Sequence, residues 1–164
     1  KAIKELSRRG QLPVKVTHYI VTNSQEEWKR QALEAQEKVD SFFVLNHNSL
    51  KDEKDRPVAQ MTLGRWYLEH ILKPECSHEK QFAQEGMLSV CDDSGYNQGF
   101  DAMKLAERIV HGEKAAFLEV KAPARGPFII NRQRAEQLKI DISGIKGVEM
   151  IIEKSLALED AVKE

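Results

Sequence analysis

Two hydrophobic periods alternate along this chain. Short apolar runs and apolar–polar alternation, which are typical of strands, are separated by stretches in which apolar residues recur every three or four positions, as in amphipathic helices. This alternation predicts the α/β class, with a doubly wound, mainly parallel sheet of about four to six strands and helices on both faces. The predicted strands are residues 14–22, 41–45, 87–90, 117–120 and 128–130. The predicted helices are 1–9, 25–39, 57–72, 77–85, a helix that ends at His111 and Gly112, 131–138 and a tail from 147 onward.

The most informative segment covers residues 85–112, EGMLSVCDDSGYNQGFDAMKLAERIVHG. Its apolar run stops at Cys91, and apolar residues then recur at helical spacing until Gly112, which suits the left-handed position after a helix end. Ligands of open α/β sheets bind outside the carboxyl ends of the strands, so residues 92–98 lie where a ligand is expected. The same pattern also suits an ordinary turn in which Asp93 and Ser94 cap the following helix.

Hydrogen-bonding side chains follow three of the predicted strands. Amides, hydroxyls and one or two carboxylates suit the reversible capture of a small polar molecule. One carboxylate of the Asp92–Asp93 pair is expected to meet an amino or hydroxyl group of the ligand, whereas Tyr96 offers a ring face and a hydroxyl, or else packs on the sheet edge. The candidate ligand contacts are Asn46, Asn48, Ser49, Asp92, Asp93 and Tyr96, with Asn23 and Ser24 at the margin.

Sequence motifs of catalysis are missing. The chain has no GxGxxG, GxxxxGK[ST], HExxH or GxSxG, and its five histidines have no ligand spacing. The Asp92–Asp93 pair is of the type that holds Mg²⁺ in receiver domains, but no acceptor Asp stands at Leu45-Asn46. We therefore predict no catalysis, no metal and no cofactor. The alternatives are a flavodoxin-like or receiver-like α/β signalling or enzyme domain, and a scaffold that dimerises through its tail helix.

Composition narrows the class of partner. The 164 residues are 41% hydrophobic and 31% charged, as in ordinary globular domains, and 25 Lys+Arg against 26 Asp+Glu leave a net charge of -1. This balance indicates neither a nucleic-acid partner nor an anionic membrane surface. The chain opens on Lys1 within a predicted helix end, so we expect a piece of a longer protein, with any targeting segment upstream.

The two cysteines leave two alternatives open. Cys76 and Cys91 form no CxxC pair, which argues against a metal site. They are either a disulfide, which requires Cα atoms within about 7 Å, or two small buried residues.

Four pieces of the chain together resemble a known family. They are VDSFFVLNHNSLKDE (39–53), WYLEHILKPE (66–75), EGMLSVCDDSGYNQGFDAMKLAERIVHGEKAA (85–116) and GPFIINRQRAEQLKIDI (126–142). Their order resembles the carboxyl-terminal lobe of ABC-transporter substrate-binding proteins, in the uncharacterised tryptophan-binding-protein-like group with a type I periplasmic-binding fold. Lys139 stands where Gly is common in that group. The charged segment 51–56 resembles instead relatives that serve as sensory input domains of larger signalling proteins.

This resemblance implies a solute-binding domain for ABC-type import or ligand sensing. The expected organisation is a ligand-binding lobe at residues 1–142, with the upstream lobe of the bilobal protein absent, and a tail helix at 143–164. The implied partners are an amino acid, amide or sugar-like ligand, the upstream lobe, and an ABC permease or a downstream signalling module. The implied location is periplasmic or extracytoplasmic, where a bond between Cys76 and Cys91 would persist.

Overall fold

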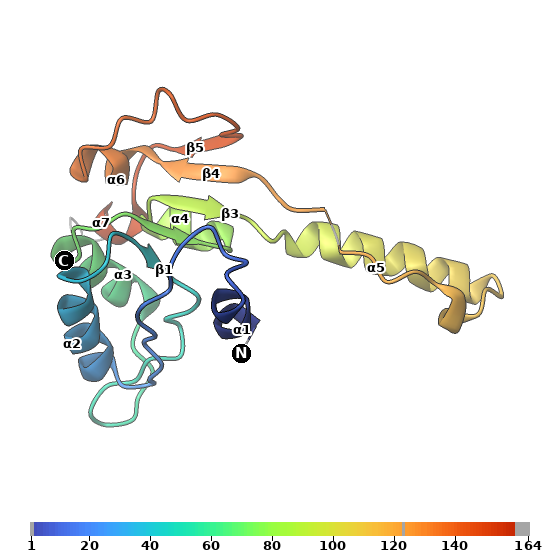
Figure 1. The fold of residues 1–164 in the computed structure, drawn as a ribbon, viewed down its shortest axis with the longest axis horizontal. Helices are drawn as coiled ribbons and strands as arrows, with labels where there is room; N and C mark the ends of the chain where they lie inside the picture. Colours follow the sequence, from blue (N-terminus) through green and yellow to red (C-terminus); the bar gives the residue numbers. More distant parts are fainter. Residues whose placement is uncertain (1, 123, 160–164) are drawn as a thin grey trace. The chain divides into compact units, whose positions relative to one another are not determined.

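The computed structural model describes residues 2–122 and 124–159, which divide into two compact units (Figure 1). The first unit comprises Lys1–Ser41 and Asn46–Lys73, and the second comprises Phe42–Leu45 and Pro74–Glu164. Each unit is a packing unit with its own buried residues.

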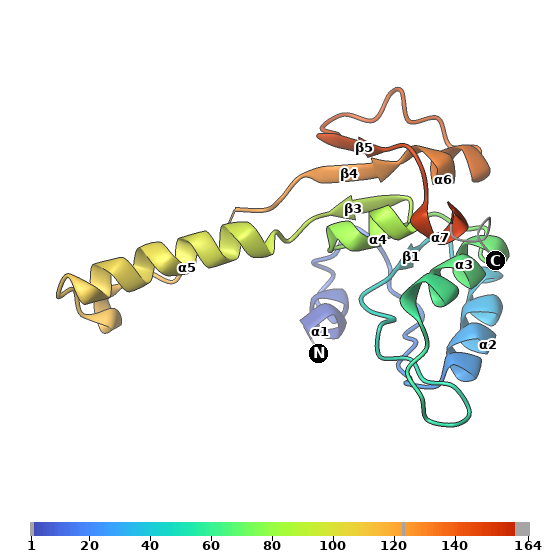
Figure 2. The ribbon, with the colours of Figure 1, turned by 180° about the vertical axis from the view of Figure 1, so that it is seen from behind.

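The second unit is built on a five-stranded sheet of strand order β1-β2-β3-β4-β5 (Figure 2). The first three strands are parallel to one another, β4 is antiparallel to β3, and β5 is parallel to β4. Three of the four strand pairs are thus parallel, which confirms the predicted α/β class and the mainly parallel sheet. The strands are β1 (Phe42–Phe43), β2 (Glu75–Ser77), β3 (Ser89–Cys91), β4 (Phe128–Asn131) and β5 (Met150–Ile152).

Apolar residues of the central strands form the core of this unit. Val90 of β3 and Ile129 and Ile130 of β4 are buried, and Phe82 on the neighbouring helix α4 is buried as well. Their burial removes apolar surface from water, which is the main driving force for this packing. The helices of the unit are α4 (Lys80–Glu85), α5 (Gly95–Val110), the 3₁₀ helix η1 (Ala115–Phe117), α6 (Arg132–Gln137) and α7 (Leu156–Glu159).

A buried polar cluster lies beside this apolar core. The Arg134 guanidinium donates to both carboxylate oxygens of Glu75, from Nε at 2.9 Å and from Nη2 at 3.1 Å. Burial raises the pKa of Glu75, while Arg134 and the Leu88 N–H favour its ionised form and oppose that shift. Asn131 caps α6 by accepting from the Arg134 N–H, and its amide donates to the Ala83 carbonyl at 2.9 Å. These contacts fix α6 against β2 and α4.

The first unit is helical. Ser24 caps α2 through a hydrogen bond from the Glu27 N–H to its hydroxyl. Trp28 on α2 and Tyr67 on α3 pack with ring centroids 6.0 Å apart, and His47 stacks on Trp28. This aromatic cluster joins the loop around His47 to the helix pair. The helices are α1 (Ala2–Arg8), α2 (Gln25–Gln36) and α3 (Gln60–His70).

Four element predictions need correction. Residues 14–22 and 117–120 form no strand, because no described segment of the chain offers either of them a ladder of hydrogen bonds. The predicted tail helix is wrong at Met150–Ile152, which pair with β4 as β5, although α7 follows. The tail residues 160–164 lie outside the described residues. Strand β2 was not predicted, because its three residues, Glu75-Cys76-Ser77, carry no apolar pattern.

Candidate functional site at the carboxyl ends of the strands

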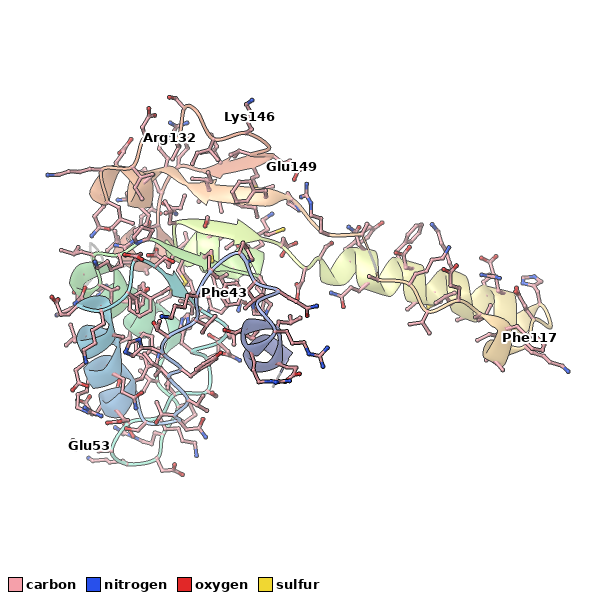
Figure 3. The ribbon with its side chains drawn as sticks, viewed as in Figure 1. Phe43, Glu53, Phe117, Arg132, Lys146 and Glu149 are labelled. Carbon is pink, nitrogen blue, oxygen red and sulfur yellow. The ribbon has the colours of Figure 1, made fainter. Side chains whose placement is uncertain are left out.

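The carboxyl ends of β1, β2 and β3 meet at one edge of the sheet, since these strands are neighbours and parallel. The chain leaves this edge at Leu45 after β1, at His78 after β2 and at Asp92 after β3. The Phe43 ring, labelled in Figure 3, stacks on the His78 imidazole with centroids 6.3 Å apart and planes 21° apart. This edge therefore combines two flat rings with the acidic turn that follows β3.

Asp92 has a structural role in this turn. Its carboxylate accepts from the Lys80 N–H at 2.9 Å, at the start of α4. Its backbone pairs with the returning chain, since Asp92 N–H donates to the Pro127 carbonyl and Gly126 N–H donates to the Asp92 carbonyl at 2.7 Å. A Cβ added to Gly126 would lie only 2.6 Å from the Asp92 carboxylate, so the two chain segments are in close contact.

Asp93 has the carboxylate that is available to a ligand. Its N–H donates to the His78 carbonyl at 2.8 Å, and its own carbonyl accepts from the Gln98 amide. The side chain is exposed, and within the described parts of the chain it makes no hydrogen bond or ion pair. The backbone thus fixes this residue beside His78 and leaves its charge free.

Ser94, rather than Asp93, caps helix α5. Its hydroxyl accepts from the Asn97 N–H at 3.2 Å, and its φ of 43° places it in the left-handed region, which is unusual for a residue with a side chain. Tyr96 lies in the first turn of α5, is 80% exposed, and stacks on Phe100 with centroids 6.2 Å apart. The alternative in which Tyr96 packs on the sheet edge is wrong.

The other predicted contacts belong to the first unit. The Asn46 carboxamide accepts from the Asn48 N–H at 2.7 Å, closing a tight Asx turn, and Asn48 is exposed, as is Ser49. The Lys51 N–H donates to the Asn23 carbonyl, and the Gln25 N–H donates to the Lys51 carbonyl. The segment that follows Asn46–Ser49 therefore lies beside the turn at Asn23 and Ser24. The structure thus brings the eight predicted residues together as two sets: Asn23, Ser24, Asn46, Asn48 and Ser49 in the first unit, and Asp92, Asp93 and Tyr96 in the second.

Sequence reasoning missed two contributors to this edge, His78 and Phe43. His78 was grouped with histidines that lack ligand spacing, and its place at a strand end depends on the unpredicted strand β2. Phe43 belongs to the apolar run 41–45, which the sequence predicts as a strand without marking any of its residues as a ligand contact, and its side chain is 52% exposed. The signal that could have found both is their position at or directly after a strand end.

The thiols of Cys76 and Cys91 are both free and exposed. The disulfide is therefore not formed, and the alternative of two buried cysteines is wrong as well. Cys76 is exposed as a residue, but neighbouring atoms shield its thiol in part from water, and this desolvation and the charge of Glu75 raise the pKa of Cys76. Beside Cys91, Arg125 pairs with Glu149 at 2.6 Å, and this guanidinium lowers the pKa of the Glu149 carboxyl.

Two further findings concern the described residues as a whole. They contain no group of three or more His, Cys, Asp or Glu side chains arranged to hold a metal ion. They also contain no helix with the length and hydropathy required to cross a bilayer.

No protein-family model matches the chain, and no curated protein matches it. Several solved structures are similar in fold. One is the ABC domain from Streptococcus pneumoniae in complex with L-Trp, with a TM-score of 0.63 and 18% identity over 92% of this chain and 50% of that chain.

The second is the ligand-free, open structure of a substrate-binding protein with adhesive properties from Clostridium difficile, with a TM-score of 0.64 and 18% identity over 93% of this chain and 48% of that chain. The third is a conserved domain protein from Vibrio cholerae, with a TM-score of 0.63 and 15% identity over 92% of this chain and 50% of that chain. This chain thus spans about half the length of each. At these identities the likeness shows the fold alone: this chain is similar in fold to about half of each of these structures, which agrees with the fold that the resemblance implies.

Proposed function

We propose that this chain is one lobe of a bilobal solute-binding protein, which captures a small polar molecule at the carboxyl ends of β1, β2 and β3. The observation that carries the proposal is the free, exposed carboxylate of Asp93, a residue whose N–H donates to the carbonyl of His78, while the His78 ring stacks on Phe43. A carboxylate beside flat rings suits a ligand with an amino or hydroxyl group and a planar or apolar part. The fold likeness to half of a substrate-binding protein supports the same assignment.

The receiver-like alternative has less support. Receiver and flavodoxin domains have an all-parallel sheet with the order 2-1-3-4-5, whereas here β4 is antiparallel to β3 and the order is sequential. Asp92, which such a domain would use for Mg²⁺, already accepts a hydrogen bond from the Lys80 N–H. We therefore favour binding without catalysis.

In the proposed protein, the second lobe lies outside this chain and the ligand is enclosed between the two. Import then requires an ABC permease as the partner, and sensing requires a signalling module fused downstream. Both roles place the binding lobes outside the cytoplasm. A ligand of the amino acid, amide or sugar class would be bound with its polar groups shared by both lobes.

The test is a thermal-shift screen of the full gene product with the twenty common amino acids, their amides and simple sugars. A ligand at about 100 times its Kd stabilises the folded state by about 2.7 kcal/mol, which raises the melting temperature measurably. L-tryptophan belongs in the first set, since the Streptococcus structure holds it. If no compound in these classes raises the melting temperature, the proposal is contradicted.

Two matched substitutions locate the site. Asp93→Ala removes a free carboxylate, so it is expected to weaken binding of the selected compound by about 1–3 kcal/mol and leave the melting temperature of the ligand-free protein unchanged. Asp92→Ala removes the acceptor of the Lys80 N–H, so it is expected to lower that melting temperature. Calorimetric titration of both variants separates the two effects. If Asp93→Ala binds the compound with unchanged affinity, the binding site does not include Asp93 and lies elsewhere.

A further inference from the structure

The sheet of the second unit has an open edge at β5. The strand order ends at β5, and no strand among the described residues pairs with its outer side (Figure 1, Figure 2). Strands β2, β3 and β4 each have at least one buried residue, whereas all three residues of β5 and both of its neighbours, Glu149 and Glu153, are exposed or half-buried. The open edge of a sheet is a template for pairing with another strand.

The register of the sheet determines which backbone groups of β5 point outward. The Asn131 N–H donates to the carbonyl of Leu88, directly before β3, so the backbone of the preceding residue, Ile130, faces β5. Ile130 is the register partner of Ile151, and in a parallel pair a residue bonds to the two neighbours of its partner. The residues on either side of Ile151 therefore bond to β4. The N–H and the carbonyl of Ile151 itself point away from the sheet.

The sequence around Ile151 is complementary to itself. Residues 149–153 are Glu-Met-Ile-Ile-Glu, so an antiparallel pair of two copies centred on Ile151 places the three apolar residues of one copy opposite those of the other. The Ile151 side chain is 41% exposed and lies at the centre of such a pair. Many natural proteins protect an edge strand from this pairing with a charged residue or a proline, and β5 contains neither.

The charges at the two ends of β5 are compatible with this pairing. Glu149 pairs with Arg125 at 2.6 Å, and Glu153 pairs with Arg132 at 2.7 Å, so each glutamate has a positive partner within its own chain. Arg132 and Glu149 lie at opposite ends of the β4–β5 pair (Figure 3). An antiparallel pair brings the first ion pair of one copy beside the second ion pair of the other. Two carboxylates and two guanidiniums then meet at each end, so the charges balance across the interface.

We propose that this protein associates with a second copy of itself through β5, which pairs antiparallel with its counterpart about a twofold axis at Ile151. The outward N–H and carbonyl of Ile151 exchange two hydrogen bonds with the same groups of the second copy, and the two sheets become continuous. A strand of three residues buries little surface, so the association is weak and depends on concentration. Because β5 lies apart from β1, β2 and β3 in the strand order, the pairing does not depend on the proposed solute-binding function.

Analytical ultracentrifugation of the full gene product tests the pairing without any ligand. The average mass should rise from one copy toward two as the protein concentration is raised from about 10 μM to about 1 mM, the range of weak specific association. A protein that stays monomeric over this whole range would overturn the proposal. Growth of the assembly beyond two copies would overturn it as well, because a twofold interface closes on itself.

Two charge variants at one position identify the interface. Ile151→Lys and Ile151→Glu each place like charges opposite one another across the twofold axis, so each variant alone should have a dimer dissociation constant at least about ten-fold larger. An equal mixture of the two variants places opposite charges there and should form dimers again, a recovery that requires both variants to be folded. The matched control is Leu72→Lys, at an isomeric side chain that is 62% exposed in the first unit, and it should leave the dissociation constant unchanged. A mixture that stays monomeric, or an equal loss of association in Leu72→Lys, would contradict pairing at β5.

Discussion

Removing the Arg134 side chain should strongly destabilise the sheet of the second unit. Arg134 and Glu75 both have side chains that are 0% exposed, and their 2.9 Å contact joins α6 to β2. In Arg134→Met, the carboxylate of Glu75 stays buried without its positive partner. Breaking a buried ion pair in this way costs about 3–5 kcal/mol. At about 2–4 °C per kcal/mol for a chain of this size, the melting temperature should fall by about 6–20 °C.

The matched control lies on the same helix. Arg132 pairs with Glu153 at 2.7 Å, but the two side chains are 42% and 65% exposed (Figure 3). Exposed pairs contribute about 0–1 kcal/mol, so Arg132→Met should have little effect. Urea unfolding followed by circular dichroism measures both free energies. If the loss in Arg134→Met is no larger than the loss in Arg132→Met, the reasoning about the buried pair is wrong.

A second substitution distinguishes charge from packing. Glu75→Gln in the Arg134→Met background removes the buried charge and keeps an acceptor for the Leu88 N–H. This double variant should recover more than half of the loss, a coupling that a double-mutant cycle measures directly. The pH dependence has a definite sign, since burial raises the pKa of Glu75 above its ordinary 4.5. The loss of unfolding free energy in Arg134→Met should be complete above the pKa of Glu75 in the folded variant and should decrease as the pH falls through that pKa. The loss should vanish below about 4.5, the ordinary pKa of a glutamate.

Three further outcomes follow from the same geometry. Asn131→Ala should cost about 2–4 kcal/mol in urea unfolding, since it removes both a helix cap and a buried amide that donates a hydrogen bond. Gly126→Ala should cost about 1–3 kcal/mol, because its Cβ would meet the Asp92 side chain at 2.6 Å, and an unchanged stability would show that the turn adapts freely. A thiol assay on unreduced protein should find Cys76 and Cys91 both reactive, with the reaction at Cys76 accelerating as the pH rises, because burial raises its pKa.

The sequence predicted best those elements whose own pattern decides their structure. The apolar periodicity and the Ser94–Gly112 boundaries predicted α5, and the run Phe128-Ile129-Ile130 predicted β4. Such segments carry both their period and their end signals locally, so no distant residue is needed to assign them. The α/β class follows from the alternation of these segments and was predicted correctly as well.

The elements that failed depend on distant partners. Residues 150–152 were assigned to a tail helix, because their apolar residues fit either period, and only the adjacent strand β4 makes them a strand. Strand β2 shows the converse, since its buried Glu75 looks like a surface residue until Arg134, 59 positions later in the chain, is placed beside it. Short strands with charged or mixed residues are decided by tertiary contacts, which sequence periodicity does not contain.

The candidate site was predicted in part for the same reason. Strand ends could be placed from the sequence, so Asp92 and Asp93 were found together, but their roles could not be separated. The two roles differ because the Lys80 N–H donates a hydrogen bond to the Asp92 carboxylate and none to the Asp93 carboxylate, which stays free. A hydrogen bond between residues twelve positions apart is invisible to a local pattern, yet here it decides which of two adjacent acids is available to a ligand. The Asp93→Ala and Asp92→Ala pair therefore tests both the site and the tertiary contact that defines it.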